Sequence, residues 1–468
     1  MTIETWNKRY GIEEVLDFDI SHWPSPVSGS FHTLKLESMI NCGREGKSRS
    51  RTRNLIRLKK ARERKDVVNL SIHYGCCMDN IQLEAIIRLL TFDRREWVSF
   101  TMTGINDVGN FYSAKTFSEE LKYLFQEIKH VRILKLHSST RNRGHGLELL
   151  LEKIPSFTTL EELHLEGWQV DRISAAALVK SLGYHADESV HILSMRSCSF
   201  VGENSFSTFS RGLKFLKNLN SLDVSYCNLD DNDIIPLIGT IKLHPCVEKL
   251  ELEKNCCRTQ SSADIIADLI KDSNCRIKTL NIANLWVGFS EEGLMQRFVD
   301  PKPLFAALQQ NSSLYNLNIS ENYLEDDEIE YLTKMLLCRD NRSRLCSLDV
   351  SVNPFNENGA ASLLQLVRDL KTLQSIKFEN SFMRYRCTQL IQIQAEINYF
   401  GSFLGKTLDI PLSLWPNVFA RIQEGTKINQ WKDGSKLSTD HIYRFLRERT
   451  GSYGKQLSLR IAMQNATN

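Results

Sequence analysis

The stretch LYNLNISENYLEDDEIEYLTKML, residues 314–336, contains the pattern that decides the fold. Its first six residues follow the order apolar-x-x-apolar-x-apolar, with Leu314, Leu317 and Ile319 at the apolar positions. In a strand, the fourth and sixth positions point to one face, and the third and fifth point to the other. Asn322 comes three residues after Ile319, and a run with helical spacing follows it. The stretch therefore predicts a strand, a corner and a helix.

The six-residue motif recurs along the chain at a nearly constant step. It starts at residues 131, 160, 190, 219, 247, 277, 314, 345 and 373, and in weaker form at 31, 67 and 97. Most starts are 28–31 residues apart, and the longer steps of 34–37 residues indicate insertions in loops. Because a single repeat cannot bury its own apolar face, neighbouring repeats must stack to form a core.

The corner of each repeat favours a side chain that can bond to turning backbone, since backbone groups there have no partners in the sheet. Several repeats place Cys or Asn at this position: Cys198, Cys227, Asn255, Asn322 and Asn353. The pattern LxxLxLxx(N/C) followed by a helix resembles the leucine-rich repeat, in particular its ribonuclease-inhibitor-like subclass. The resemblance covers about 31–385. It implies an α/β solenoid shaped as a horseshoe, with a curved parallel sheet inside and helices outside.

Three regions follow from the repeat pattern. We expect a capping segment at 1–30, an array of about twelve repeats at 31–385, and a helical C-terminal cap at 386–468. The tail sequence LWPNVFARI … IYRFLRE resembles a tail found behind repeat arrays in uncharacterised proteins of microalgae. It is also similar to the short helical boxes by which substrate adaptors bind ubiquitin ligases. Capping of the last repeat and recruitment of a ligase therefore remain alternatives for this region.

Composition narrows the class of protein. The chain is 42% hydrophobic, which predicts an extensive folded core, and its net charge of +3 is too small for nucleic-acid binding along its whole length. None of the twelve cysteines lies in a CxxC pair, so we expect reduced thiols. No apolar signal segment and no run of 18 apolar residues occurs. The sequence predicts a cytoplasmic or nuclear protein without a membrane span.

The odd positions of the strands predict the surface that binds a partner. A horseshoe presents its third, fifth and seventh strand positions on the concave face, where such arrays commonly bind. Carboxylates concentrate in the middle of this face, which predicts a basic patch on a protein partner; a merely solvated face is the alternative. The residues that we assign to this surface are Glu162, His164, Glu166, Arg196, Asp223, Glu251, Glu253, Asn281, Asn318 and Asp349.

A basic run, REGKSRSRTRNLIRLKKARERK, occupies residues 44–65 and falls in the first long step as an insertion. It has eleven Lys or Arg against two Glu. Three interpretations stay open: a solvated insertion, a nuclear-localisation or nucleic-acid patch, and an anionic membrane surface. Nucleic acid is expected, if at all, only at this run. The basic patch consists of Arg49, Arg51, Arg53, Arg57, Lys59, Lys60, Arg62, Arg64 and Lys65.

Motifs of catalysis do not occur in this sequence. There is no HExxH, no GxSxG and no Gly-rich phosphate loop, so we expect no enzyme, no metal and no cofactor. The acidic EDDE at 325–328 fits a helix start, where the helix dipole favours negative charge. The sequence predicts a monomeric, non-catalytic scaffold for protein–protein interaction. Two alternatives are a small-GTPase regulator, since Ran GTPase activators share the repeat subclass, and a substrate adaptor of a ubiquitin ligase.

Overall fold

A computed structural model of the 468-residue chain shows the arrangement of the repeats. It describes residues 33–36, 69–73, 98–105, 130–138, 147–152, 159–183, 190–338, 341–378, 391–392, 394–395 and 398. The predicted capping segment 1–30 and the basic run 44–65 lie outside these residues. Only five residues of the predicted cap 386–468 lie within them. The three proposed regions therefore stay predictions.

A single twelve-stranded sheet runs through the array, and its strand order is the order of the chain. All of its neighbouring strands pair in parallel, so each repeat adds one strand beside the previous one. Each of the twelve motifs supplies one strand. The strands are β1 (Thr33–Leu36), β2 (Asn69–His73), β3 (Ser99–Ile105), β4 (Ile133–Ser138), β5 (Glu162–Glu166), β7 (Ile192–Ser194), β9 (Ser221–Asp223), β10 (Lys249–Glu251), β11 (Thr279–Asn281), β14 (Asn316–Asn318), β15 (Ser347–Asp349) and β16 (Ser375–Lys377).

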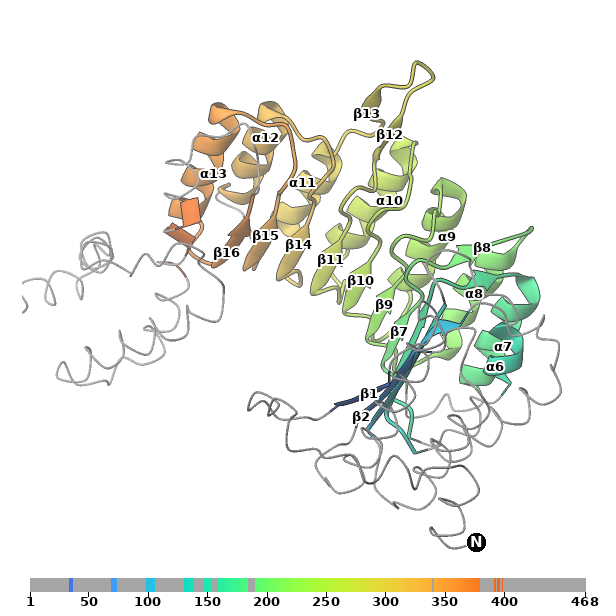
Figure 1. Cartoon of the computed structure of the whole chain (residues 1–468). Helices are drawn as coiled ribbons and strands as arrows, with labels where there is room; N and C mark the ends of the chain where they lie inside the picture. Colours follow the sequence, from blue (N-terminus) through green and yellow to red (C-terminus); the bar gives the residue numbers. More distant parts are fainter. Residues whose placement is uncertain are drawn as a thin grey trace, which may run out of the picture.

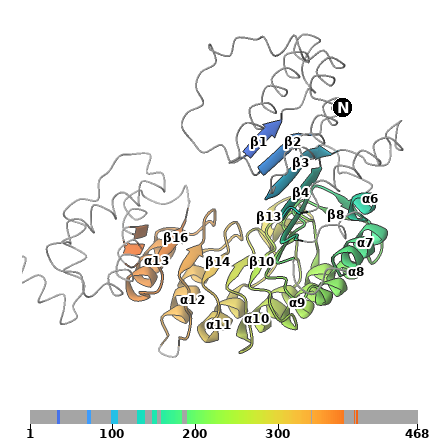
Figure 2. The same cartoon turned by 90° about the horizontal axis from the view of Figure 1, so that it is seen from below.

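Helices follow the strands and cover the outside of the arc, while the sheet lines its inside (Figures 1 and 2). They are α6 (Leu147–Leu151), α7 (Arg172–Gly183), α8 (Ser205–Gly212), the 3-10 helix η3 (Leu213–Phe215), α9 (Asp231–Lys242), α10 (Gln260–Lys271), α11 (Lys302–Gln310), α12 (Asp326–Leu336) and α13 (Glu357–Asp369). Two small sheets join β6 (Gln169–Val170) to β8 (Ser199–Phe200), and β12 (Val287–Phe289) to β13 (Met295–Arg297). The predicted α/β horseshoe with a parallel sheet inside and helices outside is confirmed.

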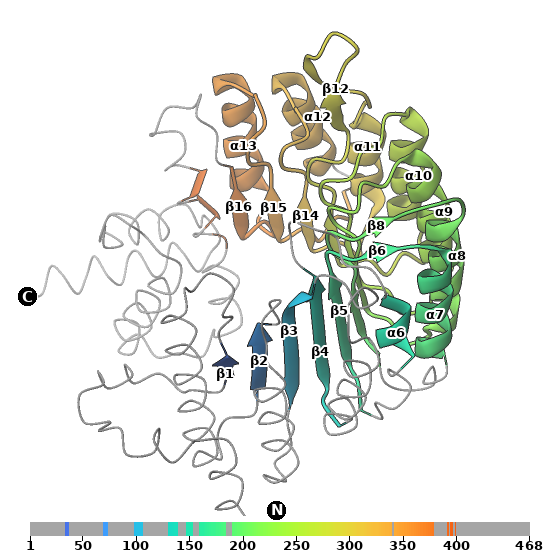
Figure 3. The same ribbon diagram turned by 45° about the vertical axis from the view of Figure 1, so that its right-hand side comes forward.

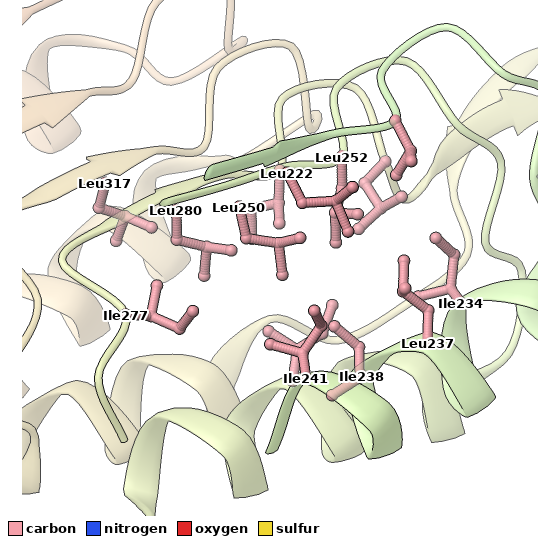
Figure 4. Close-up of a cluster of buried hydrophobic side chains, with 14 of the residues drawn as sticks. Leu222, Ile234, Leu237, Ile238, Ile241, Leu250, Leu252, Ile277, Leu280 and Leu317 are labelled. Carbon is pink, nitrogen blue, oxygen red and sulfur yellow. The ribbon is translucent and has the colours of Figure 1, made fainter. Parts of the chain in front are cut away.

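The core lies between the sheet and the helices, as the alternation of each motif requires. In β5, Leu163 and Leu165 are buried, whereas Glu162, His164 and Glu166 are only half-buried. The fourth-position leucines of successive strands stand in one register row and face the isoleucines and leucine of α9 (Figure 4). Each fully buried leucine contributes about 2 kcal/mol, so the continuous core holds neighbouring repeats together.

The side chains at the corner position make the hydrogen bonds to backbone groups that the sequence predicted. Asn255 accepts hydrogen bonds from the backbone NH groups of Cys227 (3.2 Å) and Leu229 (3.0 Å), and donates to Val224 O and Leu252 O. Asn322 and Asn353 make the same kind of contact with their preceding repeats. The cysteines act as donors: Cys198 Sγ lies 3.4 Å from Leu165 O, and Cys227 Sγ lies 3.0 Å from Met195 O.

One corner residue was missed from the sequence. Trp168 takes the Asn/Cys place in the repeat that starts at 160, and its indole Nε1 donates to Leu136 O at 2.8 Å. The side chain is fully buried, so one residue supplies both a core group and the backbone donor of the corner. Leu285 occupies the same place in the repeat that starts at 277 and brings no polar side-chain group.

The predicted role of the EDDE run as a helix start is confirmed. Helix α12 begins at Asp326, and a capping box joins Glu325 to Glu328. The carboxylate of Glu328 accepts the backbone NH of Glu325 at 2.9 Å. The acidic run therefore satisfies the free NH groups of the first helical turn.

The residue before each corner adopts a left-handed backbone. In seven successive repeats this eighth position has a φ between 49° and 75°; the residues are Gly167, Ser197, Tyr226, Lys254, Asn284, Glu321 and Val352. A non-glycine residue pays about 1–2 kcal/mol for this conformation. The cost recurs because the chain must turn at the same place in every repeat.

Val352 is the residue of this series for which relief of strain is expected to be largest. It is β-branched, has a φ of 56° and leaves 60% of its surface exposed, so little packing is lost on replacement. Val352→Asn should raise the free energy of unfolding by roughly 1 kcal/mol, measured by urea denaturation. The control is Ile173→Asn in α7, where the exposed residue lies in an ordinary helix. Equal effects of the two substitutions would contradict the explanation by strain.

Candidate concave partner-binding surface

All ten residues of the predicted surface lie on the strands of the large sheet or within two residues of a strand end, and this sheet lines the inside of the arc (Figure 3). The fifth positions form one register row, in which each residue pairs with the next: His164, Ser194, Asp223, Glu251, Asn281, Asn318 and Asp349. Neighbouring strands are about 4.8 Å apart, so the row is a nearly continuous line of polar groups. The structure thus brings the predicted residues onto one face.

Most carboxylates on this face have a partner within the chain. Glu162 lies 3.1 Å from His164 Nε2, and Glu166 lies 3.2 Å from His137 Nδ1. Glu251 lies 3.0 Å from Lys249 Nζ. The middle of the face is therefore a mixture of paired charges, in which carboxylate oxygens remain partly exposed.

The histidine pairs depend on protonation. Burial lowers the pKa of His137 below its ordinary value, and the opposing effect of the Glu166 carboxylate does not reverse this. His137 is therefore neutral at neutral pH, and its contact with Glu166 is a hydrogen bond more than an ion pair.

Four of the predicted residues also hold the turn that follows their strand. Each accepts a hydrogen bond from the backbone NH two residues later. The pairs are Asp223 with Ser225 (2.9 Å), Asn281 with Ala283 (3.1 Å), Asn318 with Ser320 (3.0 Å) and Asp349 with Ser351 (3.0 Å). One side-chain oxygen at each of these positions is thus engaged in the fold, which sequence reasoning did not anticipate.

The centre of the surface is a network around Tyr226. The guanidinium of Arg196 lies 4.3 Å from the ring centroid of Tyr226, and Lys254 Nζ lies 5.3 Å from the same centroid. The Tyr226 hydroxyl donates to Glu253 Oε1 at 2.8 Å. Glu253 Oε2 accepts from Asn281 Nδ2 at 3.3 Å and lies 3.8 Å from Arg196 Nη1. The network spans four successive repeats and fixes the orientation of all five side chains.

Tyr226 and Lys254 were not among the predicted residues. Both occupy the left-handed eighth position of their repeats, and the sequence signal for Tyr226 was an aromatic residue directly before the corner Cys227. Partial burial alone lowers the pKa of Lys254, but the Glu321 carboxylate and the Tyr226 hydroxyl raise it above its ordinary value. Lys254 therefore keeps its charge and extends the network to Glu321, at 3.4 Å.

Ser194, His164 and Asp223, which share the register row of this face, do not form a Ser-His-Asp triad. Strand β7 separates His164 from Asp223, and the Asp223 carboxylate instead accepts from Ser194 Oγ at 3.2 Å. A nucleophilic triad would need the histidine between the serine and the carboxylate. Within the described part of the chain, no group of three His, Cys, Asp or Glu residues could hold a metal ion, and no helix is long and apolar enough to cross a membrane. The basic patch in 44–65 lies outside that part.

Comparison with known proteins finds two curated relatives. The chain is 24% identical over 310 residues to the mouse Tonsoku-like protein, covering 59% of this chain and 20% of that protein. It is 30% identical over 205 residues to the mouse "NACHT, LRR and PYD domains-containing protein 4B", covering 44% of this chain and 22% of that protein. The chain thus spans about a fifth of the length of the curated relatives it matches. No family model matches.

Solved structures with a similar fold include the yeast Rad7 and Elc1 complex and an internalin from Listeria monocytogenes. The first has a TM-score of 0.44 at 15% identity and covers 82% of this chain and 92% of that one. The second has a TM-score of 0.34 at 15% identity, with 68% and 70% covered.

The ribonuclease-inhibitor-like subclass and the likeness of the tail to microalgal proteins stay predictions. The repeated motif itself forms the strands and corners of one curved parallel sheet, and leucine-rich repeats are part of a curated relative's name. The chain is a leucine-rich-repeat protein.

Proposed function

We propose that this chain is a non-catalytic scaffold whose concave face binds a protein partner. The observation that carries the proposal is the network of Arg196, Tyr226, Glu253, Lys254 and Asn281. Tyrosine and arginine are the residue types that most often dominate the binding energy of interfaces. Here they are held in place before any partner arrives, so binding loses little side-chain entropy.

The chemistry of the face favours a partner that presents Lys or Arg side chains. The Glu162 and Glu166 side chains are 29% and 38% exposed, so a cationic side chain can reach their oxygens. The internal partner of Glu166 is His137, whose pKa is lowered by burial, so this partner is neutral at neutral pH. The Glu166 carboxylate therefore keeps a negative charge that a cationic side chain of the partner can pair with, beside Lys135 of β4 and Arg196 of the next repeat.

The two alternative functions stay predictions. A small-GTPase regulator is predicted only from the repeat subclass that this chain's motif resembles. A ubiquitin-ligase adaptor depends on 386–468, of which the structure describes five residues. Among them, Asn398 Nδ2 donates to Val367 O at 2.7 Å and to Leu373 O at 2.9 Å, a contact with the last repeat that suits a cap.

Affinity capture with quantitative mass spectrometry tests the proposal. The bait is the full chain, compared with a variant carrying Glu162→Lys, Glu166→Lys and Glu251→Lys, and with Tyr226→Ala. This choice leaves Asp223 intact, because Asp223 holds the turn after β9. We expect at least one specific interactor to fall about tenfold or more in both variants, as for loss of a central interface residue.

A matched control reverses three exposed carboxylates on the outer helices: Asp264 and Asp268 of α10 and Glu330 of α12. It changes the net charge by the same amount and should keep the interactor. If the interactor is retained by the concave variants, or is lost equally with the outer control, the concave face is not the binding surface.

A further inference from the structure

The β12–β13 hairpin projects beyond the helices at the edge of the arc where the strands end (Figures 1 and 3). It occupies the long step between the repeats at 277 and 314. Val287 pairs with Arg297 and Phe289 with Met295, and Gly293 turns the chain with a φ of 77°. Neither outer edge of this two-stranded sheet pairs with another described strand.

The base of the hairpin is fixed to the array. Arg297 donates from Nη1 to Tyr323 O at 2.9 Å, and its Nη2 lies 2.7 Å from Glu328 Oε1 in helix α12. The NH of Phe298 donates to Trp286 O at 3.0 Å, and Trp286 is fully buried. The hairpin is therefore a preformed extension of the solenoid, which lowers the entropy cost of binding to it.

Large apolar side chains are exposed on this hairpin. Phe289 is 62% exposed, Leu294 63% and Met295 50%, and Tyr323 in the adjoining loop is 39% exposed. Eight large hydrophobic residues are exposed in the described part of the chain, and half of them are these four. Phe289 and Met295 are a cross-strand pair and so share one face. Exposed apolar groups gathered in this way mark an interaction site.

The charge around these apolar side chains is acidic. The exposed carboxylates are Glu291, Glu292, Glu325 and Asp327. Within the hairpin, the positive charge of Arg297 is paired with the Glu328 carboxylate. The guanidinium of Arg258 lies 5.1 Å from the ring centroid of Phe298. Like charge disfavours nucleic acid and anionic membranes at this place, and opposite charge favours a segment with Lys or Arg.

We propose that the β12–β13 hairpin and the Tyr323 loop form a second docking surface, for an extended peptide segment of a protein partner with apolar anchors between Lys or Arg residues. The peptide adds to a free edge of the hairpin through its backbone, as in other strand-addition complexes. Its apolar side chains cover Phe289 and Met295, and its basic residues face the four carboxylates. This surface lies outside the concave face and does not depend on the proposed function.

Selection from a library of random peptides displayed on phage tests the proposal, with the immobilised full chain as target. Peptides that also bind a Phe289→Ser/Met295→Ser variant are removed. The remaining pool should be enriched in apolar residues flanked by Lys or Arg. The proposal is overturned if no pool distinguishes the two targets, or if the pool has no excess of Lys and Arg over Asp and Glu.

Fluorescence anisotropy with the most enriched peptide then tests the residues. Phe289→Ser/Met295→Ser and Glu291→Lys/Glu292→Lys should each weaken binding about tenfold or more, because one removes the apolar contact and the other the charge. Leu243→Ser, at a position 87% exposed after α9, is the control and should bind as the native chain does. Unchanged binding by either hairpin variant overturns the proposal. So does native self-association that Phe289→Ser/Met295→Ser abolishes, because the occupant is then a second copy of this chain.

Discussion

Asn322→Ala is expected to lower the free energy of unfolding by about 3–4 kcal/mol. Asn322 is fully buried at a corner and bonds only to backbone. Its Oδ1 accepts from the NH groups of Leu285 (3.0 Å) and Trp286 (3.2 Å), and its Nδ2 donates to Ile282 O (2.8 Å) and Ser320 O (3.2 Å). Alanine removes the side-chain partner of Leu285 NH, Trp286 NH and Ile282 O in a place that water does not reach, whereas Ser320 O keeps its bond from Asn284 NH at 3.0 Å.

The loss should also change how the chain unfolds. Three of the four partners belong to the preceding repeat, so Asn322 joins two repeats. In a solenoid the stability of the whole depends on such nearest-neighbour contacts. We therefore expect the urea transition of Asn322→Ala to broaden or split, as the two parts of the array unfold separately.

Two further substitutions make this prediction specific. Asn322→Cys keeps a donor, as the native Cys198 and Cys227 corners do, and should cost less than Asn322→Ala. Asn316→Ala removes an exposed amide whose bond goes to Thr279 Oγ1, and should change stability by less than about 0.5 kcal/mol. Circular dichroism during urea denaturation measures all three. If Asn316→Ala costs as much as Asn322→Ala, the corner amide has no special role.

The repeat step allowed the fold to be predicted because it is a property of spacing and not of individual contacts. Each of the twelve motifs forms one strand, and the third and fifth positions of the motifs lie on the concave face. The corner was predictable for Asn255, Asn322 and Asn353, whose amides carry both donor and acceptor. It was not predictable for Trp168, because an indole supplies an NH donor without the acceptor that an Asn amide also brings.

The contacts within the site were less predictable. Arg196 and Glu253 are 57 residues apart, and their approach to 3.8 Å depends on side-chain direction across a curved sheet. Tyr226 joins them because its left-handed backbone turns its ring toward the face. The long step at 277 indicated an insertion, but nothing in its length showed that it forms a hairpin with exposed Phe289 and Met295.

Arg297→Met is expected to cost about 3 kcal/mol, since breaking a largely buried ion pair leaves a charge without compensation. The side chains of Arg297 and Glu328 are 19% and 10% exposed, and their atoms approach to 2.7 Å. The double variant Arg297→Met/Glu328→Gln should recover a large part of the loss, because no unpaired charge remains. Arg132→Met is the matched control: its pair with Glu161 is as short, at 2.6 Å, but 57% and 39% exposed. We expect no measurable change there.

Acid should reduce the loss of unfolding free energy caused by Arg297→Met. This pH dependence separates the contribution of the ion pair from that of the packing of the arginine side chain. Burial alone raises the pKa of Glu328, but Arg297 and the NH of Glu325 lower it below its ordinary value of 4.5. The native pair therefore stabilises the fold above about pH 4.5 and loses this contribution as pH falls through the lowered pKa of Glu328. In Arg297→Met the pKa of Glu328 rises, so the carboxylate takes up a proton and its penalty disappears in acid. Urea denaturation at pH 7 and pH 4 should show a smaller difference between native chain and variant at pH 4; an equal difference would mean that the loss comes from packing of the arginine side chain.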